Sequence, residues 1–242
     1  MELQEFVVMI KQLITGLGAS AMIFVLTLLF SMPLGLLVAF GRMSKWAPFR
    51  FLKTEGKGTG GMKGFLAEFK PIQLIVKFFI AILRGTPLML QLFAIYFGPY
   101  YLLGIPISLE YRFIAVIVGF SVNYAAYFAE IYRSGIESIP VGQYEAATVL
   151  GYNKVQTFFK IIFPQMCKRI LPPVTNEAIT LVKDTSLAFV ISYPEMFTIA
   201  KQISSAKTTM VPLIAAGVFY FICNGVVAFV MERIEKKMNY YR

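Results

Sequence analysis

Long apolar segments alternate with short basic segments along this chain. Each apolar segment approaches or exceeds the roughly 20 residues that an α-helix needs to cross a bilayer. The polar segments between them are too short to form a separate soluble domain. We therefore predict one all-α membrane domain over residues 1–242, with about five transmembrane helices. The expected spans are about 13–40, 72–103, 113–131, 171–191 and 211–231.

Proline positions suggest departures from straight helices in the first two spans. The first span is longer than a bilayer requires, so we expect it to tilt or to kink near Pro33. The second contains R-G-T-P at 84–87, and each half is short for a crossing of its own. One long broken helix is therefore the preferred interpretation. Broken helices at membrane depth line cavities or lie buried in protein.

Lysine and arginine are unevenly distributed between the two sides of this arrangement. Segment 42–70 holds seven, segment 133–169 five and segment 233–242 four, whereas the opposite side holds four in all. Cytoplasmic loops carry the excess of basic residues. The sequence therefore predicts an N-terminus outside and a C-terminus in the cytoplasm. Two acids open the chain, so we expect the first span to be retained rather than removed as a signal peptide.

Composition excludes several classes of function. Hydrophobic residues make up 57% of the chain and charged residues only 15%, which is far from a soluble domain. The net charge of +10 is explained by the cytoplasmic loops, so we expect a lipid bilayer and no nucleic acid as partner. With no histidine and two separate cysteines, we expect no metal site and no catalytic residues.

A glycine- and lysine-rich stretch, T-E-G-K-G-T-G-G-M-K-G at 54–64, invites comparison with a phosphate-binding loop. That loop requires G-x-x-x-x-G-K followed by Ser or Thr. Here Gly58 follows Gly56-Lys57, and Phe51 stands where the first glycine is needed. We interpret the stretch as a flexible basic linker. The chain then has no nucleotide site of its own and is not an enzyme.

Segment 140–165 is too polar to cross a membrane and has one apolar side. A short helix is expected from Gln143 to Gly151, where glycine can adopt the left-handed conformation that ends a helix. Asn153 can cap a second short helix, with Gln156 in capping-box spacing, and Pro164 is expected to limit it.

The first of these helices presents a small apolar face made of Ala146, Ala147 and Leu150, with Glu145 at its start. A helix that lies on lipid favours large apolar residues, so a protein partner is the better interpretation. An interfacial helix that only completes a loop is the alternative.

Three motifs resemble one family of membrane proteins. E-A-A at 145–147, Gly151 and I-I-F-P at 161–164 resemble the EAA loop of the permeases of ATP-binding-cassette (ABC) importers of type I, with Phe163 where leucine is more frequent. R-G-T-P-L at 84–88 with Q-L-F at 91–93, and K-D-T-S-L at 183–187, resemble the branch that takes up polar amino acids.

This resemblance implies partners and roles. The EAA segment would be a coupling helix that docks on a separate ATPase subunit, where ATP and Mg²⁺ bind; this chain would bind no cofactor. Glu145 would fix its orientation, Ala146 and Ala147 would permit close approach, and Gly151 would turn the chain. An extracytoplasmic solute-binding protein and a second permease copy, identical or a close paralogue, would complete an importer in the bacterial cytoplasmic membrane.

The fourth span carries polar and charged residues at membrane depth. At 100° per residue they fall within a stripe of roughly 120° that must face a cavity or another subunit. These residues are Asn176, Glu177, Thr180, Lys183 and Asp184. Either Lys183 is neutralised by an acid and holds helices together, or the stripe is a pathway for a cationic or zwitterionic substrate.

Further polar residues in the second and third spans have two possible roles. Asn123, Tyr127, Glu130 and Ser134 form a helical stripe in which Glu130 can pair with Arg133, which favours a structural role for Glu130. At the break in the second span, Arg84 and Thr86 suit either the pathway or the support of freed backbone carbonyls.

Two functions remain from different classes. The first is the membrane-spanning subunit of an ATP-driven importer of polar amino acids. The alternative is a self-contained ion-coupled carrier or channel for small polar solutes, in which the EAA segment has no role. The sequence leaves open which amino acid is carried and whether the dimer is homomeric.

Overall fold

The computed structural model describes residues 3–48 and 68–238, so the linker predicted at 54–64 lies outside the described residues. Within these ranges the chain is helical and contains no strand, which confirms the predicted fold class. In chain order the helices are α1 (Leu3–Arg42), α3 (Pro71–Gly85), α4 (Leu88–Leu103), α5 (Leu109–Glu137), α6 (Val141–Val149), α7 (Lys154–Thr157), the π-helix η2 (Phe158–Ile162), α8 (Phe163–Asp184), the 3₁₀-helix η3 (Thr185–Ile191), α9 (Met196–Lys207) and α10 (Val211–Met238).

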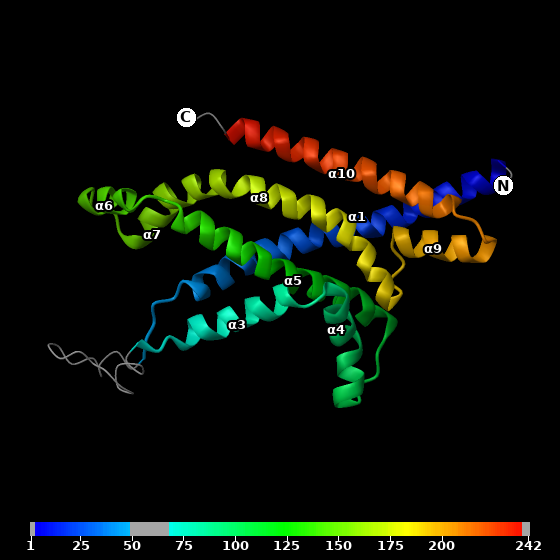
Figure 1. Ribbon diagram of the computed structural model, residues 1–242, viewed down its shortest axis with the longest axis horizontal. Helices are drawn as coiled ribbons and strands as arrows, with labels where there is room; N and C mark the ends of the chain where they lie inside the picture. Colours follow the sequence, from blue (N-terminus) through cyan, green and yellow to red (C-terminus); the bar gives the residue numbers. More distant parts are fainter. Residues whose placement is uncertain (1–2, 49–67, 239–242) are drawn as a thin grey trace.

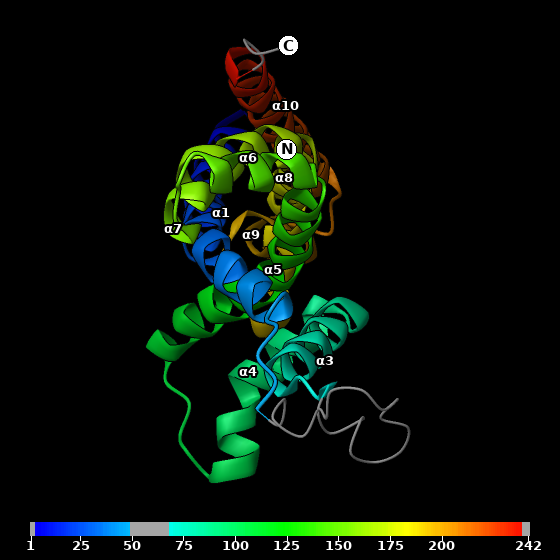
Figure 2. The same ribbon diagram turned by 90° about the vertical axis from the view of Figure 1, so that its left-hand side faces the viewer.

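Five helices, α1, α3, α5, α8 and α10, run roughly along the long axis of the molecule, whereas α4 lies across it (Figure 1). Viewed from the end, α10 lies at one edge of the bundle and α3 and α4 at the other (Figure 2). The segments predicted to be cytoplasmic gather toward one end: the end of α1, the start of α3, α6 with α7, and the end of α10. The segments that the lysine and arginine distribution assigned to one side therefore do lie toward one end of the molecule. Which end faces the cytoplasm stays a prediction.

Three helices of the described chain, α1, α5 and α10, are each long and apolar enough to cross a membrane, and α3 with α4 forms a fourth candidate. The break falls where the sequence predicted it. Thr86 is extended and Pro87 precedes the first turn of α4, so the chain turns by 107° between the two helices. α8 is not among these candidates, because its polar stripe lowers its hydropathy. A count of five spans therefore stays a prediction.

The most extensive helix contact in the described chain joins α1 to α5. Gly35 makes the close approach possible, because a Cβ there would lie 2.7 Å from Cβ of Phe128 and 3.0 Å from the Ala125 carbonyl oxygen. α1 continues through Pro33 without an interruption of the helix. Small residues at such contacts are typical of helix packing within membranes.

A fully buried carboxylate fixes α9 between α1 and α10. Glu195 caps α9 by accepting hydrogen bonds from the backbone amides of Phe197 and Thr198, each at 2.7 Å. It also accepts from the hydroxyls of Ser20 on α1, at 3.3 Å, and Tyr220 on α10, at 3.0 Å. α9 was not predicted from the sequence, because its 12 residues are too few to cross a membrane.

Candidate functional site

A cavity of about 530 Å³ lies where the break between α3 and α4 meets α5 and α8. It brings together polar residues from the three spans in which the sequence placed candidate residues. The lining residues are Arg84, Gly85, Thr86, Pro87, Leu88, Asn123, Tyr124, Tyr127, Glu177, Thr180, Asp184 and Leu187. The wall thus combines one guanidinium, two carboxylates and several neutral polar groups.

Side-chain amides support the break itself. The amide nitrogen of Gln91 donates to the carbonyl oxygens of Leu83, at 2.9 Å, and Thr86, at 3.1 Å. Asn123 donates to the same Leu83 oxygen, at 3.1 Å, and to the side-chain oxygen of Gln91, at 2.9 Å. These bonds satisfy carbonyls that lose their helical partners at Pro87. Asn123 therefore supports the cavity wall as well as lining it.

The charged groups of the cavity are left available to a ligand. Arg84 holds none of the freed carbonyls; its guanidinium carbon lies 5.2 Å from the centre of the Tyr127 ring. The Tyr124 hydroxyl donates a 2.7 Å hydrogen bond to Oδ2 of Asp184, which orients that carboxylate. Glu177 lines the same cavity from the same face of α8, about two turns before Asp184. A cation and two anions in one concave site suit a zwitterionic or cationic solute.

The predicted α8 stripe divides into a cavity face and an outer edge. Glu177, Thr180 and Asp184 lie within about 60° of one another and line the cavity. Asn176 and Lys183 lie about 100–120° from Glu177, and both are exposed. Within residues 3–48 and 68–238, no ion pair joins Lys183 to Asp184 or Glu177, and the choice between the two predicted roles of Lys183 stays open.

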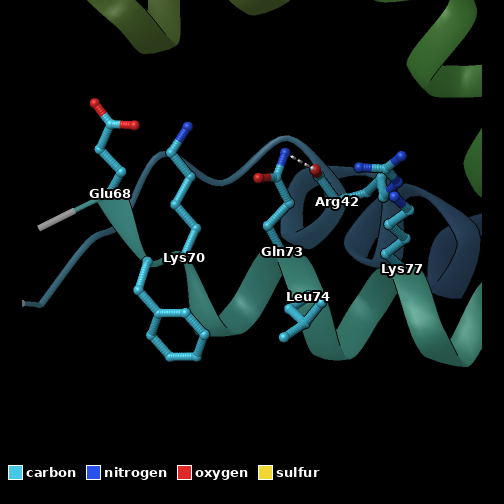
Figure 3. Close-up of a pocket in the computed structure, with 7 residues that line it drawn as sticks. Arg42, Glu68, Lys70, Gln73, Leu74 and Lys77 are labelled. Atoms are coloured by element: carbon cyan, nitrogen blue, oxygen red, sulfur yellow. Dashed lines mark hydrogen bonds between the residues drawn. The ribbon is translucent and has the colours of Figure 1, made fainter. Parts of the chain in front are cut away.

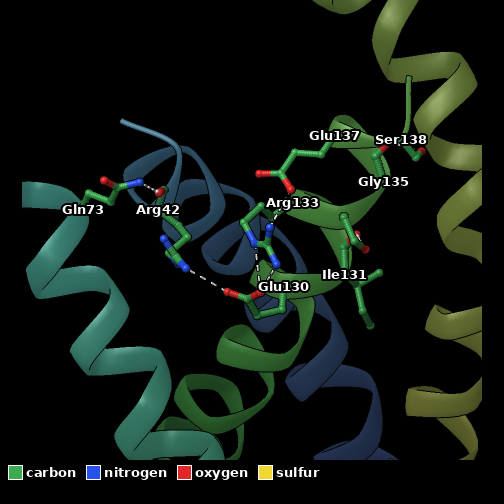
Figure 4. Close-up of polar contacts among 9 residues, drawn as sticks. Arg42, Gln73, Glu130, Ile131, Arg133, Gly135, Glu137 and Ser138 are labelled. Atoms are coloured by element: carbon green, nitrogen blue, oxygen red, sulfur yellow. Dashed lines mark hydrogen bonds and ion pairs between the residues drawn. The ribbon is translucent and has the colours of Figure 1, made fainter. Parts of the chain in front are cut away.

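Glu130 belongs to an ion-pair cluster outside the cavity (Figure 4). Arg133 binds Glu130 at 2.7 Å, as predicted from their spacing, and also binds Glu137 at 2.6 Å. Nε of Arg42, at the end of α1, lies 3.6 Å from Glu130. Glu130 is thus placed as a structural residue that joins α1 to α5, while Asn123 and Tyr127 of the same stripe line the cavity.

The turn between α6 and α7 has the features that the sequence predicted, although α6 begins at Val141 rather than at Gln143. Gly151 has a φ of +75°, and the amides of Gly151 and Tyr152 bond back to the carbonyls of Thr148 and Ala147, as in a Schellman motif. Asn153 and Gln156 exchange both bonds of a capping box, at 2.9 and 3.0 Å. The turn between α6 and α7 is therefore built by local interactions.

The outward face of α6 differs in one residue from the predicted face. Glu145, Ala146 and Leu150 are exposed, whereas Ala147 is fully buried within this chain. Ala147 is buried against its own chain and is therefore not available to a partner in this arrangement. Val149 extends the exposed apolar face instead, with 88% of its surface accessible.

Tyr144 and Thr148 of α6 face a second cavity of about 390 Å³, which they share with residues at the ends of α1 and α5. Partial burial raises the pKa of the Tyr144 hydroxyl. α6 thus borders a cavity shared with the ends of α1 and α5, and it packs on η2, which leads into α8.

Pro164 does not limit the helix that begins at Lys154, contrary to the prediction. The chain passes from α7 into the π-helix η2 and then into α8, with Pro164 in the first turn of α8. A π-turn changes the hydrogen-bond register, so the proline sits where a backbone donor is not required. The EAA segment is therefore continuous with the helix that carries Glu177 and Asp184.

The sequence did not predict the roles of two residues at the cavity and of one in the buried network of α9. Tyr124 lies next to Asn123 in the sequence but outside the predicted stripe. The spacing of the residues did not predict its hydrogen bond to Asp184. Gln91 entered the sequence analysis only as part of a family motif. A polar residue four positions after Pro87 could have predicted a side chain that bonds to the backbone carbonyls at the break. Glu195 lay in a segment taken as a loop.

Comparisons with known proteins agree with this geometry. Residues 59–240 match the family model described as "Binding-protein-dependent transport system inner membrane component". The chain belongs to this family. It is 37% identical over 175 residues to the arginine transport system permease protein ArtQ of Bacillus subtilis (strain 168), covering 72% of this chain and 78% of that one.

A second relative from Bacillus subtilis (strain 168), the probable amino-acid ABC transporter permease protein YckA, is 34% identical over 232 residues. That match covers 94% of this permease and 89% of the relative. A solved structure described as an amino acid ABC transporter with histidines has a TM-score of 0.78 at 28% identity, with 98% and 99% of the two chains covered. The permease is thus a multi-pass protein of the bacterial inner membrane.

Proposed function

We propose that the permease carries polar amino acids as the membrane-spanning subunit of an ATP-driven importer. The observation that carries this proposal is the cavity that holds Arg84 opposite Glu177 and Asp184. The guanidinium would bind the α-carboxylate, since arginine pairs with carboxylates in a two-bond geometry. One acid would bind the α-ammonium, and the second would favour a cationic side chain over an anionic one. Family membership favours this function over a self-contained carrier.

The second part of the proposal is that α6 transmits ATP hydrolysis to the cavity. ATP and Mg²⁺ would bind on a partner ATPase, and the exposed Glu145, Ala146, Val149 and Leu150 would dock in its groove. Movement of α6 would pass through η2 into α8, which carries two of the cavity acids. Ala147 would act by letting α6 pack closely on its own chain.

The third part concerns the other partners. Lys183 and Asn176 are exposed at the depth of the cavity acids, where a lipid-facing charge is costly. We expect a second permease copy, related by a two-fold axis, to cover this edge of α8. An extracytoplasmic binding protein would deliver the substrate, as the family description implies.

The test of the pathway uses the permease assembled with its ATPase in proteoliposomes and compares arginine, glutamine and glutamate as solutes. We expect ATP-dependent uptake in which Asp184→Asn and Glu177→Gln reduce arginine transport most, by roughly tenfold or more, since each removes a charge-assisted contact. Arg84→Gln should reduce all three. Glu137→Gln, which alters the peripheral ion pair, is the control. Uptake that needs no ATPase would instead support the ion-coupled carrier.

The test of coupling compares Glu145→Lys with Glu235→Lys, a charge reversal on the same predicted side but away from α6. We expect the first to lower solute uptake per ATP hydrolysed, by roughly tenfold if one interfacial charge pair is lost, and the second to leave it unchanged. Full coupling in Glu145→Lys would overturn the docking role of α6.

A further inference from the structure

A basic cavity of about 540 Å³ lies between the end of α1 and the start of α3, away from the substrate cavity (Figure 3). Its lining includes three cationic side chains, Arg42, Lys70 and Lys77, together with Gln73 and Leu74. The side-chain amide of Gln73 donates to the Arg42 carbonyl oxygen, at 3.2 Å, and so fixes the two helices beside each other. The cavity wall is thus positively charged.

The ion pairs among the described residues do not neutralise all three cationic groups of this cavity. Arg42 has a distant partner in Glu130, at 3.6 Å, and that carboxylate is already bound by Arg133. Among the described residues, no ion pair or side-chain hydrogen bond engages Lys70 or Lys77. Glu68 also borders the cavity but lies at its far end, beyond Lys70 (Figure 3). Several like charges around one space favour an anion between them.

Lys77 lies about 10 Å further along α3 than Lys70, given a rise of 1.5 Å per residue. Lys77 is exposed and stands inside the predicted second span, where an unpaired charge is unfavourable. Its long side chain can extend along the helix toward the headgroup layer. Figure 3 shows it directed to the same side of α3 as Arg42. A negatively charged headgroup is therefore the natural partner at this depth.

An apolar stripe continues from the basic face of α3. At 100° per residue, Lys70 and Lys77 lie within about 20° of each other, Leu74 about 40° away and Phe78 about 80° away. Leu74 and Phe78 are 54% and 67% exposed, so this stripe faces lipid in the membrane. A cationic site bordered by a lipid-facing stripe matches a molecule with an anionic head and apolar tails.

We propose that this cavity binds the phosphate headgroup of an anionic phospholipid of the cytoplasmic leaflet, with an acyl chain along Leu74 and Phe78. Basic pockets between helices on the cytoplasmic side are suited to such headgroups. The lipid would bridge the end of α1 and the start of α3, next to the Glu130 cluster that ties α1 to α5 (Figure 4). The proposal depends on the predicted orientation and not on the transported solute.

The test is native mass spectrometry of the full-length permease titrated with phosphatidylglycerol and, separately, with phosphatidylcholine. We expect selective retention of phosphatidylglycerol, which falls by roughly tenfold or more in the double variant Lys70→Gln with Lys77→Gln. Lys77→Arg, which keeps the charge, should retain it. The matched control is Lys236→Gln with Lys237→Gln, which removes the same charge toward the same end of the molecule.

Competition with inorganic phosphate and glycerophosphoglycerol distinguishes a lipid from a soluble anion. Either compound should displace the lipid only weakly, because neither contacts the apolar stripe. Displacement at equal concentration would assign the site to a soluble phosphate and overturn the proposal. Unchanged retention in the double variant, or an equal loss in the control variant, would also overturn it, because the bound lipid would then not depend on this cavity.

Discussion

The hydroxyl of Tyr124 donates a 2.7 Å hydrogen bond to Oδ2 of Asp184, and this bond joins α5 to α8 in the wall of the substrate cavity. Tyr124→Phe removes the donor and keeps the ring. A hydrogen bond to a charged group contributes about 1.5–3 kcal/mol. We therefore expect the apparent solute affinity to fall by roughly tenfold or more, with the fold intact. Uptake kinetics in proteoliposomes measure the effect, and an unchanged KM would show that Asp184 needs no such orientation.

Close packing of α1 on α5 predicts sensitivity at Gly35. A methyl group there would stand 2.7 Å from Cβ of Phe128, so Gly35→Ala forces the helices apart. We expect a loss of about 1–3 kcal/mol, the usual cost of overpacking. Gly18→Ala is the control on the same helix, because nothing lies within 4 Å of its Cβ position. Thermal unfolding of the two variants in detergent should separate them, and equal midpoints would contradict this packing.

The buried Glu195 network predicts that α9 and α10 depend on one carboxylate. Glu195→Ala leaves the amides of Phe197 and Thr198 and the hydroxyl of Tyr220 without their acceptor. We expect destabilisation of about 3 kcal/mol or more, against a smaller loss for Tyr220→Phe, which removes one donor.

Thermal unfolding of the purified permease measures these losses. Glu110→Ala, in the exposed first turn of α5, serves as the control for removal of an acid and should change little. A Glu195→Ala variant as stable as the control would show that water replaces the lost acceptor.

The turn after α6 predicts a local effect at Gly151. Its φ of +75° is strained for any residue with a Cβ, so Gly151→Ala should cost about 1 kcal/mol. Because the turn sets the angle between α6 and α7, we expect weaker ATPase binding with little change in global stability. Gly142→Ala, which has open space around it, is the matched control. Affinity for the ATPase, measured in detergent, should fall only in the first variant.

Local features of the fold followed from the sequence because local physics decides them. Apolar length indicated membrane helices, Pro87 indicated the break, and Gly151 with Asn153 indicated the ends of α6 and α7. Each depends on neighbours within a few residues: a missing amide, a left-handed φ or a capping side chain. The helical period likewise placed Glu177 and Asp184 on one face of α8.

The tertiary structure decided the rest, because contacts between distant helices have no signature in spacing. It joined Tyr124 to Asp184 by a hydrogen bond, placed Lys183 outside the cavity lining, and brought Arg42 to Glu130. It also turned Ala147 inward, since a helix with two adjacent alanines does not reveal which one meets its own chain. The sequence by itself thus determined the membrane-embedded helices and the polar residues they carry. Only the packing of those helices determined which polar residues share a cavity, because that depends on how each helix is rotated against its neighbours.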